Sequence, residues 1–171
     1  GANVPFLRSE ETSNDYATTA DVLSEVITKY KEIGQEFDLM CCIYPTAPFV
    51  TADKLKNAVG KLQEEHADSL MPVVRFGFPP QRAVVVRDGK ITYQYQEFAV
   101  VRSQDLEPIY HDCGQFYLCK VNAFYQYKTV ITPNTIPFIM PEEEVQDIDN
   151  FTDWALAEVK YRTFILGKET E

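Results

Sequence analysis

The sequence predicts an α/β domain with a mostly parallel β-sheet. Residues 20–34 and 51–67 each carry apolar side chains at helical spacing, and the run at 37–44 between them is almost continuously apolar. A strand that is apolar on both faces is typical of the middle of a sheet that helices cover. Residues 70–76 form another apolar run after the second helix. This alternation of helices and strands favours parallel strands.

A threonine precedes each of these two helices. Thr18 or Thr19 caps the first helix if its hydroxyl accepts a hydrogen bond from the backbone of the first turn. Alternatively, the same hydroxyls at a helix start contact the oxygens of a ligand. The side chains expected to face the core from the second helix are Leu55, Val59 and Leu62.

The second half of the chain continues the alternation of strands and helices. We expect strands at 115–121 and 136–140, a short helix within 122–130, and a closing helix at 151–164. The side chains expected to face inward from the closing helix are Trp154, Leu156 and Val159.

A β-hairpin interrupts this pattern. Asp88 and Gly89 lie between the strand-like runs 83–86 and 91–95, and an Asp-Gly pair is a strong signal for a two-residue hairpin turn. A hairpin inserted into an alternating chain exposes its apolar side chains unless another surface covers them. We therefore expect residues 78–114 to form an arm that contacts a second subunit.

Composition limits the possible partners. The 171 residues suit one globular domain, with 45% hydrophobic residues and a formal net charge of −10. Such a negative charge argues against a nucleic-acid groove, and an anionic substrate would need local cations or a bound metal. No signal peptide and no apolar run long enough for a membrane span is visible. The four cysteines lack CxxC spacing, which favours buried free thiols in a reducing cytoplasm.

The stretch from Arg102 to Tyr117 is unusual for a solvated loop. It combines a guanidinium, carboxamides, carboxylates and the imidazole of His111 with the aromatic rings of Tyr110 and Phe116. This mixture is typical of a pocket that binds a polar ligand through a few placed groups. The alternative is an irregular loop whose polar groups satisfy one another. For His111 we favour a ligand hydrogen bond or a loop anchor over a proton shuttle.

Two further sets of charged residues are candidates for chemistry. Asp147 and Asp149 are two positions apart, so in an extended segment both carboxylates point the same way and suit Mg²⁺. The alternative for this pair is helix capping by Asp149 or Asn150. Arg82 and Arg102 lie at the two ends of the proposed arm, where each binds a carboxylate or phosphate or pairs with a nearby acid.

Taken together, seven segments resemble the CMP–sialic acid synthetase family of acylneuraminate cytidylyltransferases, and most of all its pseudaminic acid branch. The specific part is Arg102-Ser103-Gln104-Asp105-Leu106 followed by Tyr110-His111-Asp112-Cys113-Gly114-Gln115-Phe116-Tyr117. The other segments, in the same order as in the family, are residues 4–8, 15–23, 44–48, 81–83 and 147–149.

The resemblance implies a Rossmann-like, three-layer nucleotidyltransferase domain over residues 1–171, with the hairpin arm crossing to a second copy in a homodimer. It implies an enzyme that transfers CMP from CTP to a nine-carbon acidic sugar and releases pyrophosphate. Pseudaminic, legionaminic and sialic acids are the sugars considered, and Mg²⁺ is the implied cofactor. No nucleic-acid or membrane partner is expected.

The resemblance also implies roles for individual residues. Asp147 and Asp149 match the residues that hold Mg²⁺, and Arg102 is grouped with them as a catalytic candidate. The residues implied on the nucleotide side are Thr18, Thr19, Tyr44, Pro45, Thr46 and Ala47. The residues implied on the sugar side are Arg82, Arg102, Gln104, Gln115, Phe116 and Tyr117, to which we add His111.

The chain departs from the family pattern in two ways. Tyr44 stands where the sialic acid branch has glutamine, which favours the pseudaminic branch. The family's N-terminal strand and phosphate loop are missing from the sequence. We therefore expect that an N-terminal portion belongs before Gly1 and that the 171 residues alone have little or no transferase activity.

Two other function classes compete with this interpretation. A GT-A glycosyltransferase also combines an α/β nucleotide domain with an Asp-x-Asp metal site. Its acidic pair usually follows a strand in the middle of the chain, whereas Asp147 and Asp149 come just before the last predicted helix. The other alternative is a dimeric domain that binds a nucleotide or sugar without turnover.

Overall fold

The structure is a computed structural model that describes residues 1–167. The chain divides into two compact units. The first unit consists of residues 1–45, 50–71 and 115–138, and the second of 46–49, 72–114 and 139–171. Whether the whole chain acts as one domain with residues 78–114 as an inserted arm stays a prediction.

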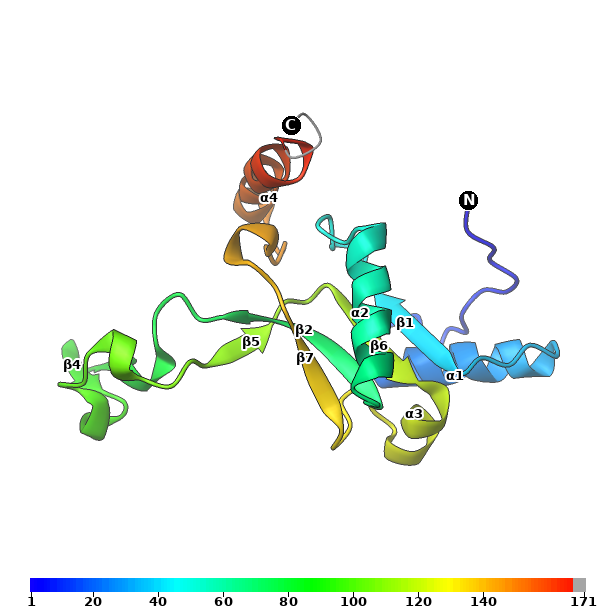
Figure 1. The fold of residues 1–171 in the computed structure, drawn as a ribbon, viewed down its shortest axis with the longest axis horizontal. Coiled ribbons are helices and arrows are strands. Elements are labelled where there is room, and N and C mark those ends of the chain that lie inside the picture. Colours follow the sequence, from blue (N-terminus) through cyan, green and yellow to red (C-terminus); the bar gives the residue numbers. More distant parts are fainter. Residues whose placement is uncertain (168–171) are drawn as a thin grey trace. The chain divides into compact units, whose positions relative to one another are not determined.

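The first unit contains three helices and most of the sheet (Figure 1). Its elements are α1 (Thr19–Glu32), β1 (Leu39–Ile43), α2 (Ala52–Glu64), the beginning of β2 (Ser69–Arg75), β6 (Phe116–Lys120), α3 (Val121–Tyr127) and most of β7 (Thr135–Ile139). Each overlaps a helix or strand that the sequence predicted, so the mixed α/β class is confirmed.

The second unit contains the end of β2 and four further elements. These are β3 (Val84–Arg87), β4 (Lys90–Tyr93), β5 (Tyr110–Asp112) and α4 (Phe151–Phe164). The predicted hairpin is present, because β3 pairs antiparallel with β4, and Asp88 and Gly89 both adopt positive φ in the turn. Within this unit the hairpin lies away from the β2–β5 pair (Figure 1). Strand β5 was not predicted.

The sheet is mixed, which corrects the prediction of a mostly parallel one. Its order is β1-β6-β2-β5 with β7 beside β2, and the pairs β1–β6, β2–β6 and β2–β5 are antiparallel. Asp68 N–H donates to Asn134 O, and Met140 N–H to Val73 O, which is the order of a parallel β2–β7 pair. Strands β1 and β2 therefore run the same way but are separated by β6. The alternation of helices and strands does not reveal that a later strand inserts between two earlier ones.

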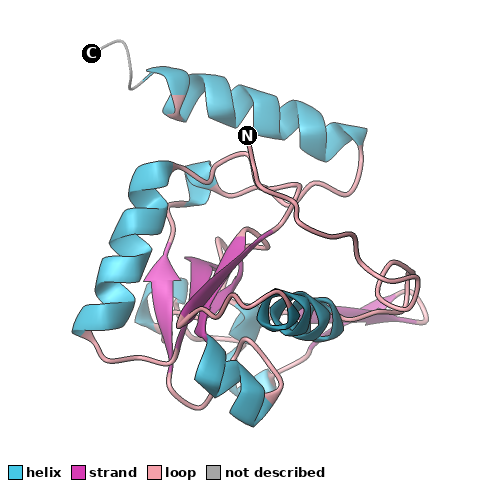
Figure 2. Ribbon diagram, turned by 90° about the vertical axis from the view of Figure 1, so that its right-hand side faces the viewer, coloured by secondary structure: helices cyan, strands magenta, loops and turns pink. Residues whose placement is uncertain are grey.

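Strand β1 corrects a second expectation, because it ends the strand order instead of lying in the middle of the sheet. Ile43 is 49% exposed and Phe37, just before the strand, is 52% exposed. The core of the first unit instead lies between α2 and strands β2 and β6. Figure 1 labels these elements, and Figure 2 shows the helices and strands from a second side. Leu62 is buried there with Leu55 and Val59 packed against the cluster, as predicted.

Helix α4 turns a different face inward than the sequence suggested. Trp154, Leu156 and Val159 are 57%, 49% and 63% exposed, whereas Ala157 is buried. Tyr161, one turn after Ala157, packs against Phe49 with ring centroids 6.2 Å apart. Helix α4 carries apolar side chains on more than one face, so its spacing alone does not select the covered one.

No helix within residues 1–167 has the length and apolar character needed to cross a bilayer.

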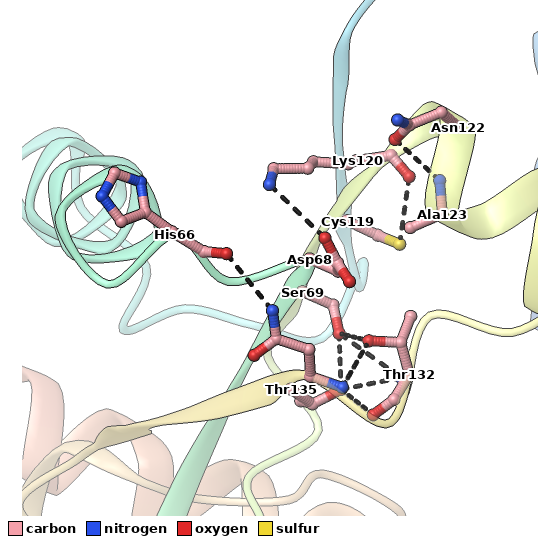
Figure 3. A network of polar contacts seen from close by, with 10 residues as sticks. His66, Asp68, Ser69, Cys119, Lys120, Asn122, Ala123, Thr132 and Thr135 are labelled. Atoms are coloured by element: carbon pink, nitrogen blue, oxygen red, sulfur yellow. Dashed lines mark hydrogen bonds and ion pairs between the residues drawn. The ribbon is translucent and has the colours of Figure 1, made fainter.

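A buried group of hydroxyls connects β2 to the loop before β7 (Figure 3). Ser69 is fully buried, and its Oγ lies 2.5 Å from Thr135 Oγ1 and 3.3 Å from Thr132 Oγ1. The backbone N–H of Thr132 donates to Thr135 Oγ1 at 2.7 Å. These contacts satisfy polar groups that would otherwise be buried without hydrogen bonds.

We predict that Ser69→Ala lowers the free energy of unfolding by about 1–3 kcal/mol, because it removes the hydroxyl that these two threonines share. Urea denaturation followed by circular dichroism measures the change. Thr28→Ala is the control, because the Thr28 hydroxyl is exposed on α1 and donates to Ser24 O within the same helix, so its effect should stay within about 0.5 kcal/mol. Equal effects of the two substitutions would contradict the role assigned to Ser69.

Candidate functional site

The start of α1 holds the first group of predicted residues. Thr18 is the N-cap: its hydroxyl accepts from Asp21 N–H, and the Asp21 carboxylate accepts from Thr18 N–H, which completes a capping box. The hydrogen bonds from the Thr18 side chain and backbone lower the pKa of Asp21. Thr18 is therefore engaged in capping, which leaves Thr19 as the hydroxyl available for other contacts.

Thr19 contacts Tyr44, which in turn contacts Tyr117, and the three residues come from three segments of the first unit. Thr19 Oγ1 lies 3.1 Å from the Tyr44 hydroxyl, and the Tyr44 and Tyr117 rings have centroids 5.3 Å apart. Tyr44 N–H also donates to Gln115 O at 2.9 Å. Four residues that were predicted separately for nucleotide and sugar sides thus form one cluster, the Thr19–Tyr44–Tyr117 cluster.

Strand β6 buries most of the predicted sugar-side motif. Phe116 is 0% exposed and belongs to the core cluster, Gln115 is 1% exposed and Tyr117 is 5% exposed. Phe116 therefore packs in the core in this structure instead of lining a pocket. The aromatic side chain of Phe116 offers no surface to a ligand.

The second unit contains a pocket of about 270 Å³, which we call the Asp147 pocket. Its charged and polar lining comes from the end of β2, from β5, from the turn before Asp147 and from α4. The lining residues are Val74, Arg75, Gly77, His111, Asp112, Cys113, Glu142, Val145, Gln146, Asp147 and Lys160. The structure thus brings Asp147 together with the His111–Asp112 part of the specific motif.

Gly114 explains how the motif approaches Asp147. Its φ of +61° is a left-handed conformation that favours glycine, and its N–H donates to Asp112 Oδ1 at 2.8 Å. A Cβ built on Gly114 would lie 3.7 Å from Asp147 Oδ1. The turn at Gly114 therefore allows the Asp147 carboxylate to pack against the backbone of the motif.

His111 is held in a defined orientation. Its ring stacks at a tilt on Phe76 with centroids 4.6 Å apart, and Nδ1 lies 2.9 Å from the carbonyl oxygen of Asp112. A carbonyl oxygen only accepts, so Nδ1 carries the hydrogen in this contact and Nε2 of a neutral ring is an acceptor. The imidazole is thus both a loop anchor and a hydrogen-bonding group in the pocket lining.

Lys160 fastens the turn that leads to Asp147. Its ammonium donates to Val145 O at 2.6 Å and to Glu142 O at 3.3 Å. Cys113, at another wall of the pocket, is 3% exposed. Burial and the nearby Asp112 charge raise the pKa of the Cys113 thiol to about 12, so it is protonated at neutral pH and is no nucleophile.

A second pocket of about 440 Å³, the Gln104 pocket, shares part of its lining with the first. The residues common to both are Val74, Arg75, Gly77 and Glu142. Ser103 and Gln104 line only the Gln104 pocket. Gln104 is thus the predicted sugar-side residue that the structure places next to the Asp147 pocket.

The two arginines of the arm are engaged within the chain. Arg102 donates from Nε and Nη2 to the Asp105 carboxylate, at 2.7 and 3.2 Å. Arg82 donates to Ser103 Oγ at 3.2 Å, and its guanidinium lies over the Phe78 ring. Neither arginine lines the Asp147 pocket. Their predicted contacts with a sugar stay predictions.

The remaining predicted residues are less closely assembled. Asn150 caps α4 through Thr152 N–H and Asp153 N–H, and Asp149 N–H donates to the Asp153 carboxylate. Asp149 is exposed but does not line the Asp147 pocket. Tyr44 and Pro45 belong to the first unit, whereas Thr46 and Ala47 belong to the second and line neither of its two pockets.

The carboxylates of Asp147 and Asp149 suit a hard cation. Within residues 1–167 neither forms an ion pair, and no group of three or more His, Cys, Asp and Glu residues gathers there as a metal cage. One or two carboxylates completed by phosphate and water oxygens is a donor set that Mg²⁺ accepts. Asp147, at a pocket wall, is the better placed of the two.

Comparison with known proteins identifies the family of this chain. It matches no protein-family model. A pseudaminic acid cytidylyltransferase from Campylobacter jejuni is 33% identical over 163 residues, which cover 95% of this chain and 70% of the relative. The chain belongs to the pseudaminic acid cytidylyltransferase family. More distant relatives are a CMP-N,N'-diacetyllegionaminic acid synthase from Legionella pneumophila, 25% identical over 92% of this chain and 68% of that protein, and an N-acylneuraminate cytidylyltransferase from Streptococcus agalactiae, 24% identical over 92% of this chain and 40% of that protein.

Sequence reasoning missed three charged residues of the Asp147 pocket that lie outside the recognised motifs: Arg75, Glu142 and Lys160. Arg75 carried a usable signal, because it is the first charged residue after the buried end of β2, and ligands gather beyond the carboxyl ends of strands in α/β sheets. Glu142 and Lys160 carried none. A glutamate in a polar turn and a lysine on a surface helix resemble any solvated charge.

The segment before α1 is fastened by Glu25. The Glu25 carboxylate pairs with Lys29 at 2.6 Å, and it accepts from Thr12 Oγ1 and from the N–H of Ser9 at 2.7 Å. Lys29 first, and then these hydrogen bonds, lower the pKa of Glu25 to about 2. A carboxylate with a lowered pKa stabilises the folded state above its ordinary pKa of 4.5 and loses this effect as pH falls toward 2.

We predict that hydrogen exchange of the backbone around Ser9 and Thr12 quickens relative to α2 as pH falls from 4.5 to about 2, after correction for intrinsic rates. Glu25→Gln should show fast exchange already at pH 7 and little further change on acidification. Glu32→Gln, on the same helix, is the control and should follow the wild type. A pH-independent exchange ratio in the wild type would contradict this role of Glu25.

We predict that Gly114→Ala lowers the free energy of unfolding by about 1–2 kcal/mol, because a Cβ is strained at positive φ. Gly60→Ala is the matched control: Gly60 lies inside α2 with nothing within 4 Å of an added Cβ, so it should stabilise by about 0.5–1 kcal/mol. Denaturant titration of both variants measures the two opposite signs. A neutral Gly114→Ala would show that the left-handed turn is not required.

Proposed function

We propose that this protein is a CTP-dependent cytidylyltransferase that transfers CMP to a nine-carbon acidic sugar, with pseudaminic acid as the first candidate. The observation that carries the proposal is the Asp147 pocket. Asp147, which the sequence paired with Mg²⁺, lies near Gly114 and shares a pocket lining with His111 of the specific motif. Family membership indicates the class of reaction, and the shared lining of Asp147 and His111 supports the Asp147 pocket as the place where it occurs.

In the proposed reaction, a sugar hydroxyl attacks the α-phosphorus of CTP. A new oxygen–phosphorus bond forms, the bond from the α-phosphorus to the bridging oxygen breaks, pyrophosphate leaves, and the proton of the hydroxyl passes to solvent. Positioning and charge stabilisation supply most of the acceleration in such transfers. Mg²⁺ held by Asp147 and Asp149 would neutralise charge on the phosphate oxygens.

The protein's own groups have defined tasks in this proposal. His111, anchored through Nδ1 and by Phe76, presents Nε2 as an acceptor for a hydroxyl of the sugar. Lys160 keeps the turn before Asp147 in place through two carbonyl oxygens. Gln104 lines the neighbouring pocket, which is large enough for part of a sugar. Thr19 and Tyr44 are assigned to the nucleotide, and Tyr117 stays assigned to the sugar.

The homodimer also belongs to this proposal. Val86, Ile91 and Val100 of the arm are 69%, 71% and 93% exposed, and a second copy would cover them. In that arrangement Arg82 and Arg102 would approach the partner's sugar.

The direct test is an assay of pyrophosphate release with CTP, Mg²⁺ and, separately, pseudaminic, legionaminic and sialic acid, with the product identified by mass spectrometry. The protein should form a CMP-sugar with at least one of them. A protein that uses none of the three sugars, or that transfers a sugar from a nucleotide-sugar, would contradict the proposal.

We predict that Asp147→Asn lowers kcat/KM for cytidylyl transfer by at least about 100-fold, because a charge that stabilises the transition state is lost. The same variant should bind Mn²⁺ more weakly in the presence of CTP, as measured by electron paramagnetic resonance. Asp88→Asn is the control, since Asp88 lies in the hairpin turn with φ of +50°, which asparagine tolerates. Unchanged Mn²⁺ binding in Asp147→Asn would remove Asp147 from the metal site.

A further inference from the structure

We propose that Arg75 binds the carboxylate of the acidic sugar and thereby selects acidic sugars as substrates. This assignment rests on the proposed function and adds a residue that neither the sequence motifs nor the relatives' names indicate. Arg75 lies at the carboxyl end of β2, where the buried residues of the strand end. The Pro72–Val74 segment before it is buried, so the backbone that carries Arg75 is fixed by packing.

Arg75 lies where two pockets meet. It lines both the Asp147 pocket and the Gln104 pocket. In a nine-carbon 2-keto acid sugar, the carboxylate and the anomeric hydroxyl are attached to the same carbon atom. A residue that binds the carboxylate must therefore lie close to the place where the hydroxyl meets the phosphate. Arg75 shares one pocket lining with Asp147 and another with Gln104, which fits this position.

The Arg75 guanidinium is available to bind an anion. Within residues 1–167 the Arg75 side chain takes part in no ion pair, whereas Arg102 is engaged by Asp105 and Arg162 pairs with Glu158. Arg75 is the only cation that lines the Gln104 pocket in this part of the chain. A guanidinium matches a carboxylate with two parallel hydrogen bonds, so it reads the geometry of the acid as well as its charge.

The surroundings of Arg75 are negatively charged. The protein carries a formal net charge of −10, and the Asp147 pocket adds Asp112, Glu142 and Asp147 to its lining. Its other cation, Lys160, already donates to two backbone carbonyls. An anionic sugar that enters this surrounding needs an opposite charge that is not committed elsewhere, and Arg75 provides it.

The test compares Arg75→Gln and Arg75→Lys with the wild-type protein, using CTP, Mg²⁺ and the preferred sugar. Arg75→Gln should raise KM for the sugar about 10- to 100-fold and leave KM for CTP within about threefold. The KM of Arg75→Lys for the sugar should lie between those of the wild type and Arg75→Gln, because lysine keeps the charge but lacks the paired N–H donors of the guanidinium. Arg162→Gln is the matched control, since Arg162 is exposed on α4 and lines neither pocket.

A second measurement separates recognition from general damage to the site. The wild type should strongly prefer the sugar acid to the same sugar with a carboxamide in place of the carboxylate, and Arg75→Gln should lose most of that preference. If Arg75→Gln keeps the preference while the wild type is active, the assignment of Arg75 is overturned and the proposed function stands. If the wild type transfers CMP to no acidic sugar, both are overturned.

Discussion

The arrangement of the first unit depends on strand β6 lying between β1 and β2 and running opposite to both. This pairing fixes the register Cys42↔Tyr117 and Ile43↔Phe116 at the end of β1. The register brings Tyr117 next to Tyr44 and sends Phe116 into the core under α2. A slip of one residue would exchange these two roles, because successive side chains on a strand point to opposite faces. The ladder of backbone hydrogen bonds therefore decides which residues of the motif are available to a ligand.

A similar constraint operates in the second unit, where the site depends on a backbone turn rather than on one side chain. Gly114 takes a left-handed conformation, Asp112 closes the turn, and Asp147 packs against it. Lys160 holds the preceding turn by its carbonyl oxygens. The left-handed conformation thus favours glycine at this position of the motif, and the polar groups come from its neighbours. Such a division of labour is common where a rigid backbone positions charged groups.

Much of the secondary structure and part of the site could be predicted from local signals. The capping residues, the Asp-Gly turn and the apolar spacing of α2 each act over a few residues, so the sequence contains them in full. The direction of the sheet pairs and the covered face of α4 could not be predicted in this way. Trp154 and Val159 are as apolar as any core residue, yet they are exposed, because burial depends on which surface another segment covers.

The sequence by itself determined the α/β class, the positions of most helices and strands, the hairpin and the family, since these follow from local patterns and from ordered motifs. The tertiary structure alone decided that Asp147 meets the turn at Gly114, that Phe116 is buried, and that Arg75 lies between two pockets while Arg102 is engaged by Asp105. The physical reason is that a site is a set of distances between side chains far apart in the chain. Folding sets those distances through the register of strands and the burial of apolar surface, which no short stretch of sequence contains.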